Sequence, residues 1–320
     1  APLVKRHYSN SGSEFRDHWQ VTRPRLTVQG GIGTSGEAKR LLKEFGMDAT
    51  GWGSPFLMVP EATTVDRATR SLLENAGSQD LYLSSVSPLG VPFNNVRNTG
   101  SQKWHENRIA KGKPGSPCPK GFLKSNTEFT DQPICTASNQ YQLLKLDQIN
   151  RMDVDKPEKT AMRQQVLEKT CLCDHLGNGA LINLGILEER RAPQAICPGP
   201  NIAWFDRTYS LQEMVDHIYG RGDTLVPAGR PHMFAKEIEM YVDYFGELAE
   251  ESKGEEAELT KLSEFKRNLE DGIAYCQQIA ATDPYPGENL SSIAETAAKE
   301  RDRLDSIWNR VAGDLASEPS

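Results

Sequence analysis

The first clear pattern of hydrophobic and polar positions lies in the N-terminal quarter of the chain. Residues 25–29 (RLTVQ) have the short β-rich pattern of a strand. An apolar stripe with the spacing of one helix face follows; it consists of Ala38, Leu41, Leu42 and Phe45. Thr34 and Glu37 form the T-x-x-E pattern of a capping box. A second short strand comes next, so the pattern predicts a βαβ unit with parallel strands.

A second periodic pattern covers residues 231–320. The first apolar stripe repeats at alternating intervals of four and three and comprises Phe234, Ile238, Tyr241, Phe245 and Leu248. Two further stripes of similar spacing begin at Leu259 and Ile293. Such spacing is typical of helices that pack at shallow angles. We expect a helical hairpin or small bundle that docks on the rest of the chain, on a protein partner or on a second copy.

Between these two patterns, residues 76–230 are rich in Pro, Gly, Asn and Ser, with apolar residues interleaved. This texture predicts an ordered region made largely of loops. Within it, Gly177 to Ile186 is expected to form a turn that leads into a strand. The predicted organisation is therefore 1–75, a βα region; 76–230, a loop-rich region that contains cysteines; and 231–320, a helical region.

Composition narrows the class of protein. The 320 residues include 37 basic and 44 acidic ones, a formal charge of −7, and the mean hydropathy is −0.58. An acidic surface gives no reason to expect a nucleic acid partner. No apolar run approaches the roughly 18–20 residues that span a bilayer, and no signal-peptide core is present. We expect a cytoplasmic protein without membrane contact; since the chain begins with Ala1, we also expect that it is processed or is part of a longer protein.

The turn after the first strand contains the G-x-G-x-x-G spacing of a dinucleotide site, at Gly31, Gly33 and Gly36. A Rossmann fold requires an acidic residue at the end of the second strand to bind the ribose. That strand ends in Thr50-Gly51-Trp52-Gly53, which has no acid. This disfavours a nicotinamide site.

Two glycine turns after two successive strands fit a different phosphate site, the one formed at the end of a TIM barrel. Glycine has no Cβ, so its backbone N–H groups can approach a phosphate closely. The candidate phosphate-binding residues are Gly30, Gly31, Gly33, Thr34, Gly51, Gly53 and Ser54.

The stretch 28–57 (VQGGIGTSGEAKRLLKEFGMDATGWGSPFL) resembles the last two βα units of FMN-dependent TIM-barrel oxidoreductases, among them glutamate synthases, nitronate monooxygenases and IMP-dehydrogenase-like barrels. The resemblance covers residues 22–62. It implies an α/β fold with the last βα units of a partial TIM barrel, an FMN cofactor and a small-molecule substrate. About six further βα units would precede this one, in a longer protein or in another chain. The family's catalytic residues lie mostly in those units, so none is assigned here.

The loop-rich region also contains five cysteines in Pro- and Gly-flanked turns: Cys118, Cys135, Cys171, Cys173 and Cys197. Turns allow thiolates to converge, as iron–sulfur clusters and zinc both require. The spacings match no standard zinc pattern and differ from the compact cluster that follows the FMN barrel in glutamate synthase. The best four-ligand set combines Cys118, Cys135, either Cys171 or Cys173, and Cys197; the alternative is a group of buried free thiols.

Two functions from different classes follow from these patterns. The first is an FMN-dependent oxidoreductase-like protein, or its C-terminal part, with an iron–sulfur cluster or zinc on the cysteines. The second is a non-catalytic binding or assembly module with a structural zinc and a helical interaction tail. A Rossmann NAD(P) domain is a third and weaker interpretation.

Overall fold

The glycine-containing region forms a parallel βα pair, as its sequence predicts. In the computed structural model, which describes residues 2–14, 24–189, 193–252 and 254–317, strand β1 (Thr27–Gln29) pairs in parallel with β2 (Ala49–Gly51). Helix α2 (Ser35–Lys43) connects them. The capping box is confirmed, because Thr34 Oγ1 accepts from the N–H of Glu37 and the Glu37 carboxylate accepts in return from the N–H of Thr34.

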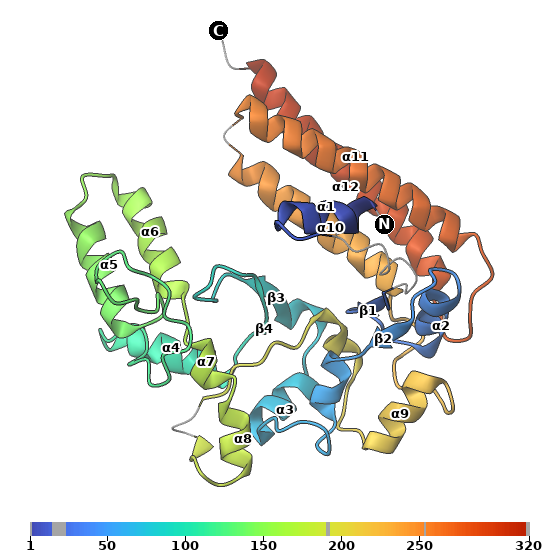
Figure 1. Ribbon diagram of the computed structural model, residues 1–320, viewed down its shortest axis with the longest axis horizontal. Helices are drawn as coiled ribbons and strands as arrows, with labels where there is room; N and C mark the ends of the chain where they lie inside the picture. The colour runs from blue at the N-terminus through green and yellow to red at the C-terminus, as the bar shows by residue number, and fades with distance from the viewer. Residues whose placement is uncertain (1, 15–23, 190–192, 253, 318–320) are drawn as a thin grey trace.

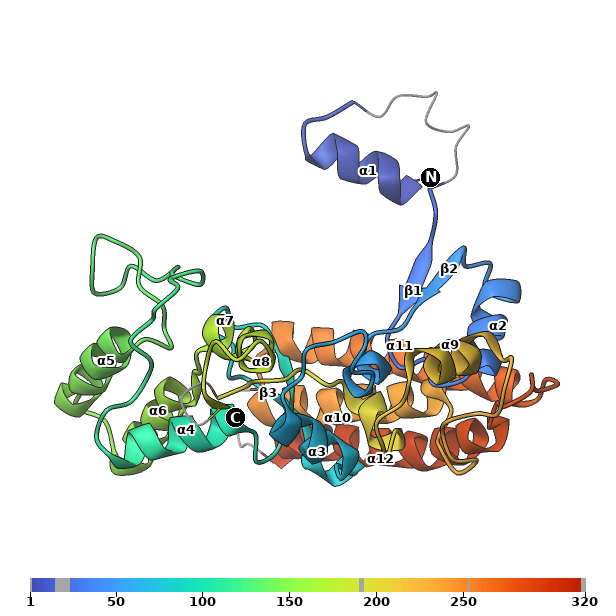
Figure 2. The ribbon, with the colours of Figure 1, turned by 90° about the horizontal axis from the view of Figure 1, so that it is seen from below.

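The following segment combines short helices with one hairpin. A 3₁₀ helix (Ser54–Met58) and α3 (Arg67–Glu74) lead to the antiparallel pair β3 (Leu81–Ser84) and β4 (Phe93–Val96). A short 3₁₀ helix (Ser78–Asp80) precedes β3. The described residues between β4 and the C-terminal region also form α4 (Gly100–Ala110), α5 (Asn139–Arg151), α6 (Lys156–Glu168), α7 (Leu172–His175), α8 (Asn178–Asn183), a 3₁₀ helix (Pro200–Trp204) and α9 (Leu211–Tyr219). Helix α1 (Pro2–Asn10) stands apart from the rest of the molecule in Figure 2.

The C-terminal region is a three-helix bundle of α10 (Met233–Glu251), α11 (Glu256–Ala280) and α12 (Leu290–Ser317), and the predicted helical bundle is thereby confirmed. In Figures 1 and 2 the βα pair and α9 lie at one end of the molecule, and α4 to α6 lie at the other. One core position differs from the predicted stripe. Tyr241 is 47% exposed, whereas its neighbour Val242 is fully buried.

The largest apolar core joins the first two predicted regions. Met58, Val59 and Leu73 pack there with residues from much later in the chain, including Ile202 and Phe205. A separate cluster in the bundle centres on Val242, Phe245 and Leu304, and a smaller one packs α2 against the start of α10. The βα pair is therefore supported mainly by residues after position 195.

The sheets of the described residues are two separate two-stranded ones, and no closed barrel is seen among these residues. The partial TIM barrel therefore stays a prediction. One expected strand is wrong: the residues after Gly177 form helix α8, Asn178–Asn183. A short apolar run does not distinguish a strand from a helix by its periodicity alone. Here the helix is fixed by tertiary contacts such as the bond from Asn178 Nδ2 to the Pro193 carbonyl, 3.0 Å.

Candidate functional site

The two glycine turns lie at the same edge of the β1–β2 sheet. The strands are parallel and Gln29 pairs with Gly51, so the turn that begins at Gly30 and the turn that contains Gly53 leave the sheet side by side. Gly30 and Gly31 have φ values of +99° and +70°, the region that favours glycine. Gly51 faces the Gln29 side chain, and a Cβ on Gly53 would meet no atom within 4 Å. The pairing of strands thus brings the predicted turns together.

Buried side chains from the later part of the chain hold three successive carbonyls of the first turn. Arg230 Nη2 donates to the Gly31 carbonyl at 2.6 Å, and Asn201 Nδ2 donates to the Ile32 carbonyl at 2.9 Å. His217 Nε2 lies 2.9 Å from the Gly33 carbonyl. All three side chains belong to buried residues, so the conformation of this turn is fixed from inside the protein.

The state of His217 follows from its two hydrogen bonds. Its Nδ1 accepts from the N–H of Leu225 at 3.1 Å, so Nε2 carries the proton that is donated to Gly33. Burial is the main cause that lowers the pKa of His217, which keeps the ring neutral in this arrangement.

Two backbone N–H groups of the first glycine turn already donate hydrogen bonds within the protein. The Glu37 carboxylate accepts from the N–H of Gly33 at 2.7 Å and from that of Thr34 at 3.3 Å. A Cβ on Gly33 would lie 2.2 Å from Arg230 Cζ, so this glycine is required by packing. Gly33 and Thr34 are therefore bound internally, and the sequence analysis did not anticipate this.

Other donors of the two turns remain available. The N–H groups of Gly31, Ile32, Gly53 and Ser54 have no acceptor within the described part of the chain. Gly31 and Gly53 are exposed to solvent. Unpaired backbone donors on two adjacent turns are the kind of group that binds a phosphate in proteins.

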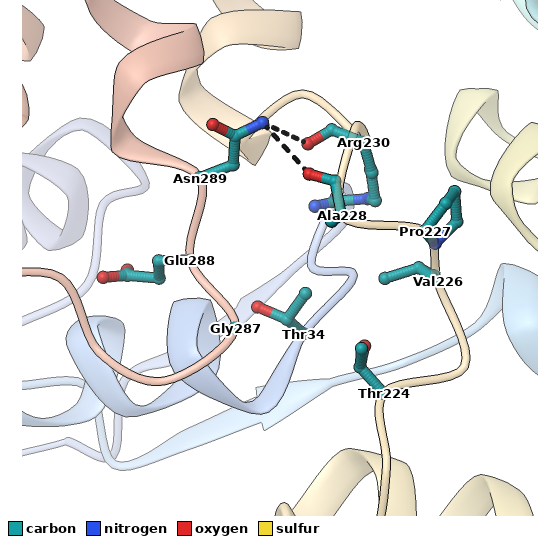
Figure 3. A pocket seen from close by; sticks show the side chains of 9 residues that line it. All are labelled: Thr34, Thr224, Val226, Pro227, Ala228, Arg230, Gly287, Glu288 and Asn289. Carbon is teal, nitrogen blue, oxygen red and sulfur yellow. Dashed lines mark hydrogen bonds between the residues drawn. The ribbon is translucent and has the colours of Figure 1, made fainter.

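On another face of the first turn lies a small cavity of about 150 Å³. Figure 3 shows the loops 224–230 and 287–289 on opposite sides of this cavity, with Thr34 beside Gly287 between them. Asn289 Nδ2 donates to the Ala228 and Arg230 carbonyls and so connects the two loops. The charged groups at this cavity already have partners, because Arg230 bonds Glu37 and Glu288 bonds Arg40. The cavity therefore lies between two loops, and the charged side chains named here are already paired and cannot bind a charged ligand.

A second buried ionic group fastens α2 to the C-terminal bundle. Arg40 Nε and Nη2 each donate to a Glu288 oxygen at 2.8 Å, and His232 Nε2 lies 3.3 Å from Glu288 Oε1. Burial alone would raise the pKa of Glu288. The hydrogen bonds from His232, Arg40 and the Tyr285 N–H outweigh it and lower the pKa to about 2. The carboxylate is thus ionised at neutral pH.

Four of the five predicted metal-binding cysteines approach one another. Burial is the main cause that raises the pKa of Cys135 to about 11, and the nearby thiols of Cys118, Cys171 and Cys173 contribute to this increase. Burial also raises the pKa of Cys173, as do the charge of Cys171 and a hydrogen bond with it. Cys118, Cys135, Cys171 and Cys173 therefore share one neighbourhood, although they come from three separate segments.

The fifth cysteine lies elsewhere. The pKa of Cys197 is raised by burial, and its hydrogen-bond partner is the Asn94 backbone of β4; none of the other thiols acts on it. All six cysteines are free. Among the described residues, no three His, Cys, Asp or Glu side chains are placed so that they would hold a metal ion without rearrangement.

Sequence reasoning missed a buried serine–histidine pair beside a second cavity. Ser101 Oγ lies 2.6 Å from His175 Nδ1, and both residues are buried. Ser101 and His105 line a cavity of about 160 Å³ near β4. The Trp104 ring also packs against His175, with ring centroids 4.9 Å apart.

Comparison with protein-family models, with curated proteins and with solved structures yields no match for this chain. In the part of the chain that is described, every helix is too short or too polar to cross a membrane.

Proposed function

We propose that this chain is part of an FMN-dependent oxidoreductase-like protein, and that its two glycine turns bind the flavin phosphate. One observation carries the proposal: the parallel pairing of β1 with β2 places both turns at one sheet edge, with unpaired N–H groups facing no protein acceptor. Bound FMN would supply the redox chemistry, and the protein would supply binding and orientation.

The roles of the turn residues follow from the donors that remain unpaired. Gly31 and Ile32 from one turn, with Gly53 and Ser54 from the other, would donate N–H groups to phosphate oxygens. The carbonyls of the first turn cannot rotate toward the anion, because Arg230, Asn201 and His217 bind them. Repulsion from the adjacent Glu37 carboxylate is reduced by its ion pair with Arg230, 2.7 Å.

The wider assembly is part of the same proposal. The βα pair would be the last two units of a TIM barrel, whose remaining strands lie outside this chain. The substrate would be a small molecule that binds near the units not present here. We place the protein in the cytoplasm, in keeping with six free cysteines.

Comparing FMN with riboflavin tests the phosphate assignment directly, because the two flavins differ only in that group. We expect the chain to quench FMN fluorescence on binding and to bind riboflavin at least about tenfold more weakly, since each 1.4 kcal/mol changes an affinity tenfold. Gly53→Val should remove this preference, because the new side chain enters the open space beside Ser54. Equal affinity for the two flavins would contradict the proposal.

Gly272→Val is the matched control for that experiment. Gly272 lies in α11, and a Cβ there also meets no atom within 4 Å. It should leave the preference for FMN unchanged. Circular dichroism melting of both variants separates a lost phosphate site from a lost fold.

The second candidate function is a non-catalytic binding or assembly module. One observation that favours it is the proximity of four thiols in a region separate from the two glycine turns, which fits a structural zinc. The long helical bundle would in addition provide a surface for a protein partner or a second copy. A protein that retains metal but binds no FMN would support this alternative.

A further inference from the structure

The segment 97–194 buries only a few apolar side chains. Besides two cysteines, its described residues bury Ile134, Ala137, Tyr141, Ile149, Val166 and Leu172, and none of these belongs to the larger apolar clusters of the described chain. Yet this segment contains three long helices and several turns in a defined arrangement. Small regions that bury little apolar surface are commonly strengthened by a disulfide or a metal. The cysteines here are free, which leaves their thiols available to a metal.

Backbone contacts hold the cysteine-containing turns together independently of the thiols. The N–H of Ser116 donates to the Ala137 carbonyl at 3.0 Å, and the N–H of Asn139 donates to the Ser116 carbonyl at 2.7 Å. These bonds place the Cys118 turn beside the Cys135 turn. An ion pair between Lys120 and Asp174, 3.3 Å, joins the same Cys118 turn to the segment that contains Cys171 and Cys173.

The backbone conformation of Cys118 is a further indication of a functional site at these cysteines. Its φ is +57°, and within the described residues only Asn98 shares a positive φ among non-glycine positions. A cysteine whose backbone is in the left-handed region destabilises the folded state by on the order of 1–3 kcal/mol, and such strained residues are concentrated at functional sites. Cys135 and Cys171 are each only 5% exposed, so two of the four thiols are shielded from solvent.

We propose that Cys118, Cys135, Cys171 and Cys173 form one tetrathiolate site for a soft metal centre, either Zn²⁺ or an iron–sulfur cluster, and that Cys197 is not a ligand. This corrects the sequence-based set, which counted Cys197 and only one of Cys171 and Cys173. Binding would release the four thiol protons to solvent. It would also require the side chains to rotate inward from their present positions, in which no three hold a metal.

This inference does not depend on the flavin proposal. His175 lies two residues beyond Cys173 but is not included, because the four thiols already make up a complete set of four ligands. Four thiolates complete a tetrahedral zinc site, and they are also the usual ligands of iron–sulfur clusters.

The test begins with the full chain purified without oxygen, with zinc, iron, sulfide and FMN measured on the same sample. The metal-free protein is then titrated with Co²⁺, whose visible absorption reports a tetrahedral thiolate site, and separately reconstituted with iron and sulfide. We expect one centre per chain, and the two arms distinguish zinc from a cluster. A chain that binds no metal in either arm overturns the inference.

Single Cys→Ser variants identify the ligands. Cys135→Ser and Cys173→Ser should each weaken Co²⁺ binding at least tenfold or abolish cluster assembly, whereas Cys197→Ser should bind as the unaltered chain does. Equal loss in Cys197→Ser, or no loss in the other two, overturns the ligand set. If circular dichroism shows that Cys135→Ser does not fold, the same measurements are made on Cys173→Ser and Cys118→Ser, since these two cysteines are only half-buried.

Limited proteolysis adds a structural readout. Removing the metal should make residues 97–194 sensitive to protease while the α10–α12 bundle remains protected. If the chain binds metal but not FMN, the proposed function is contradicted and the metal site is not. If it binds FMN but no metal, the metal site is contradicted and the proposed function is not.

Discussion

Glu37 and Arg230 form a buried ion pair, with Oε1 and Nη1 2.7 Å apart, that joins the start of α2 to the segment before α10. The same Oε1 accepts from the N–H of Met233 at 2.8 Å, and Oε2 accepts from the N–H of Gly33. One carboxylate thus links the first glycine turn, an arginine and the first residue of the bundle. The geometry of the candidate phosphate site depends on this link.

Glu37→Gln should therefore destabilise the protein strongly. Removing one partner of a buried pair leaves the other charge uncompensated, which costs about 3–5 kcal/mol. The matched control is Asp147→Asn, which breaks an exposed pair with Arg151 on α5 and should cost less than about 1 kcal/mol. Urea unfolding of the two variants measures the difference; similar losses would show that the buried pair has no special role.

Gly33→Ala should also destabilise, because the new Cβ would lie 2.2 Å from Arg230 Cζ and displace the guanidinium. Overpacking of this kind costs about 1–3 kcal/mol. Gly53→Ala, at which a Cβ meets only open space, should unfold at nearly the urea concentration of the unaltered chain. If both variants were equally stable, Arg230 would not be what requires a glycine at position 33.

The stability of the docked bundle should depend on pH through Glu288. Its pKa falls from the ordinary 4.5 to about 2 on folding. A carboxylate with a lower pKa in the folded state stabilises that state above pH 4.5, and this contribution is lost as the pH falls toward 2. Glu288→Gln should remove this component, so the difference in unfolding free energy between the two proteins should shrink over that range. A difference that stays constant with pH would contradict the prediction.

Within the bundle, Phe245→Ala should cost about 3–5 kcal/mol, because Phe245 is fully buried between the three helices. Tyr241→Ala lies one turn away on the same helix and is 47% exposed, so it should change stability by less than about 1 kcal/mol. Thermal unfolding of the two variants, monitored at 222 nm by circular dichroism, gives the comparison. A larger loss in Tyr241→Ala would support the predicted stripe over the observed packing.

The elements that could be predicted from the sequence depend on local signals. The capping box at Thr34 and Glu37, the face of α2 and the three C-terminal helices all arise from residues three or four positions apart, which interact within one helix. The pairing of two glycine turns at one edge followed from two strands of matching pattern close together in the chain. Even so, one position of the first bundle stripe was wrong: Tyr241 is exposed, whereas its neighbour Val242 is buried because of how α10 faces the other helices.

Which backbone groups of the candidate phosphate site remain unpaired depends on contacts that form only on folding. The Arg230 side chain that holds the Gly31 carbonyl lies 199 residues later in the chain, and the His217 side chain that holds the Gly33 carbonyl lies 184 residues later. Nothing in the local sequence of the turn encodes those contacts. The four cysteines of the proposed metal site likewise come from loops and the short helix α7, which have no periodic sequence signal, whereas Cys197 hydrogen-bonds to the Asn94 backbone of β4. The local elements could be predicted from short-range sequence patterns, because their hydrogen bonds close within a few residues. Folding determined the site, because its partners converge from distant parts of the chain.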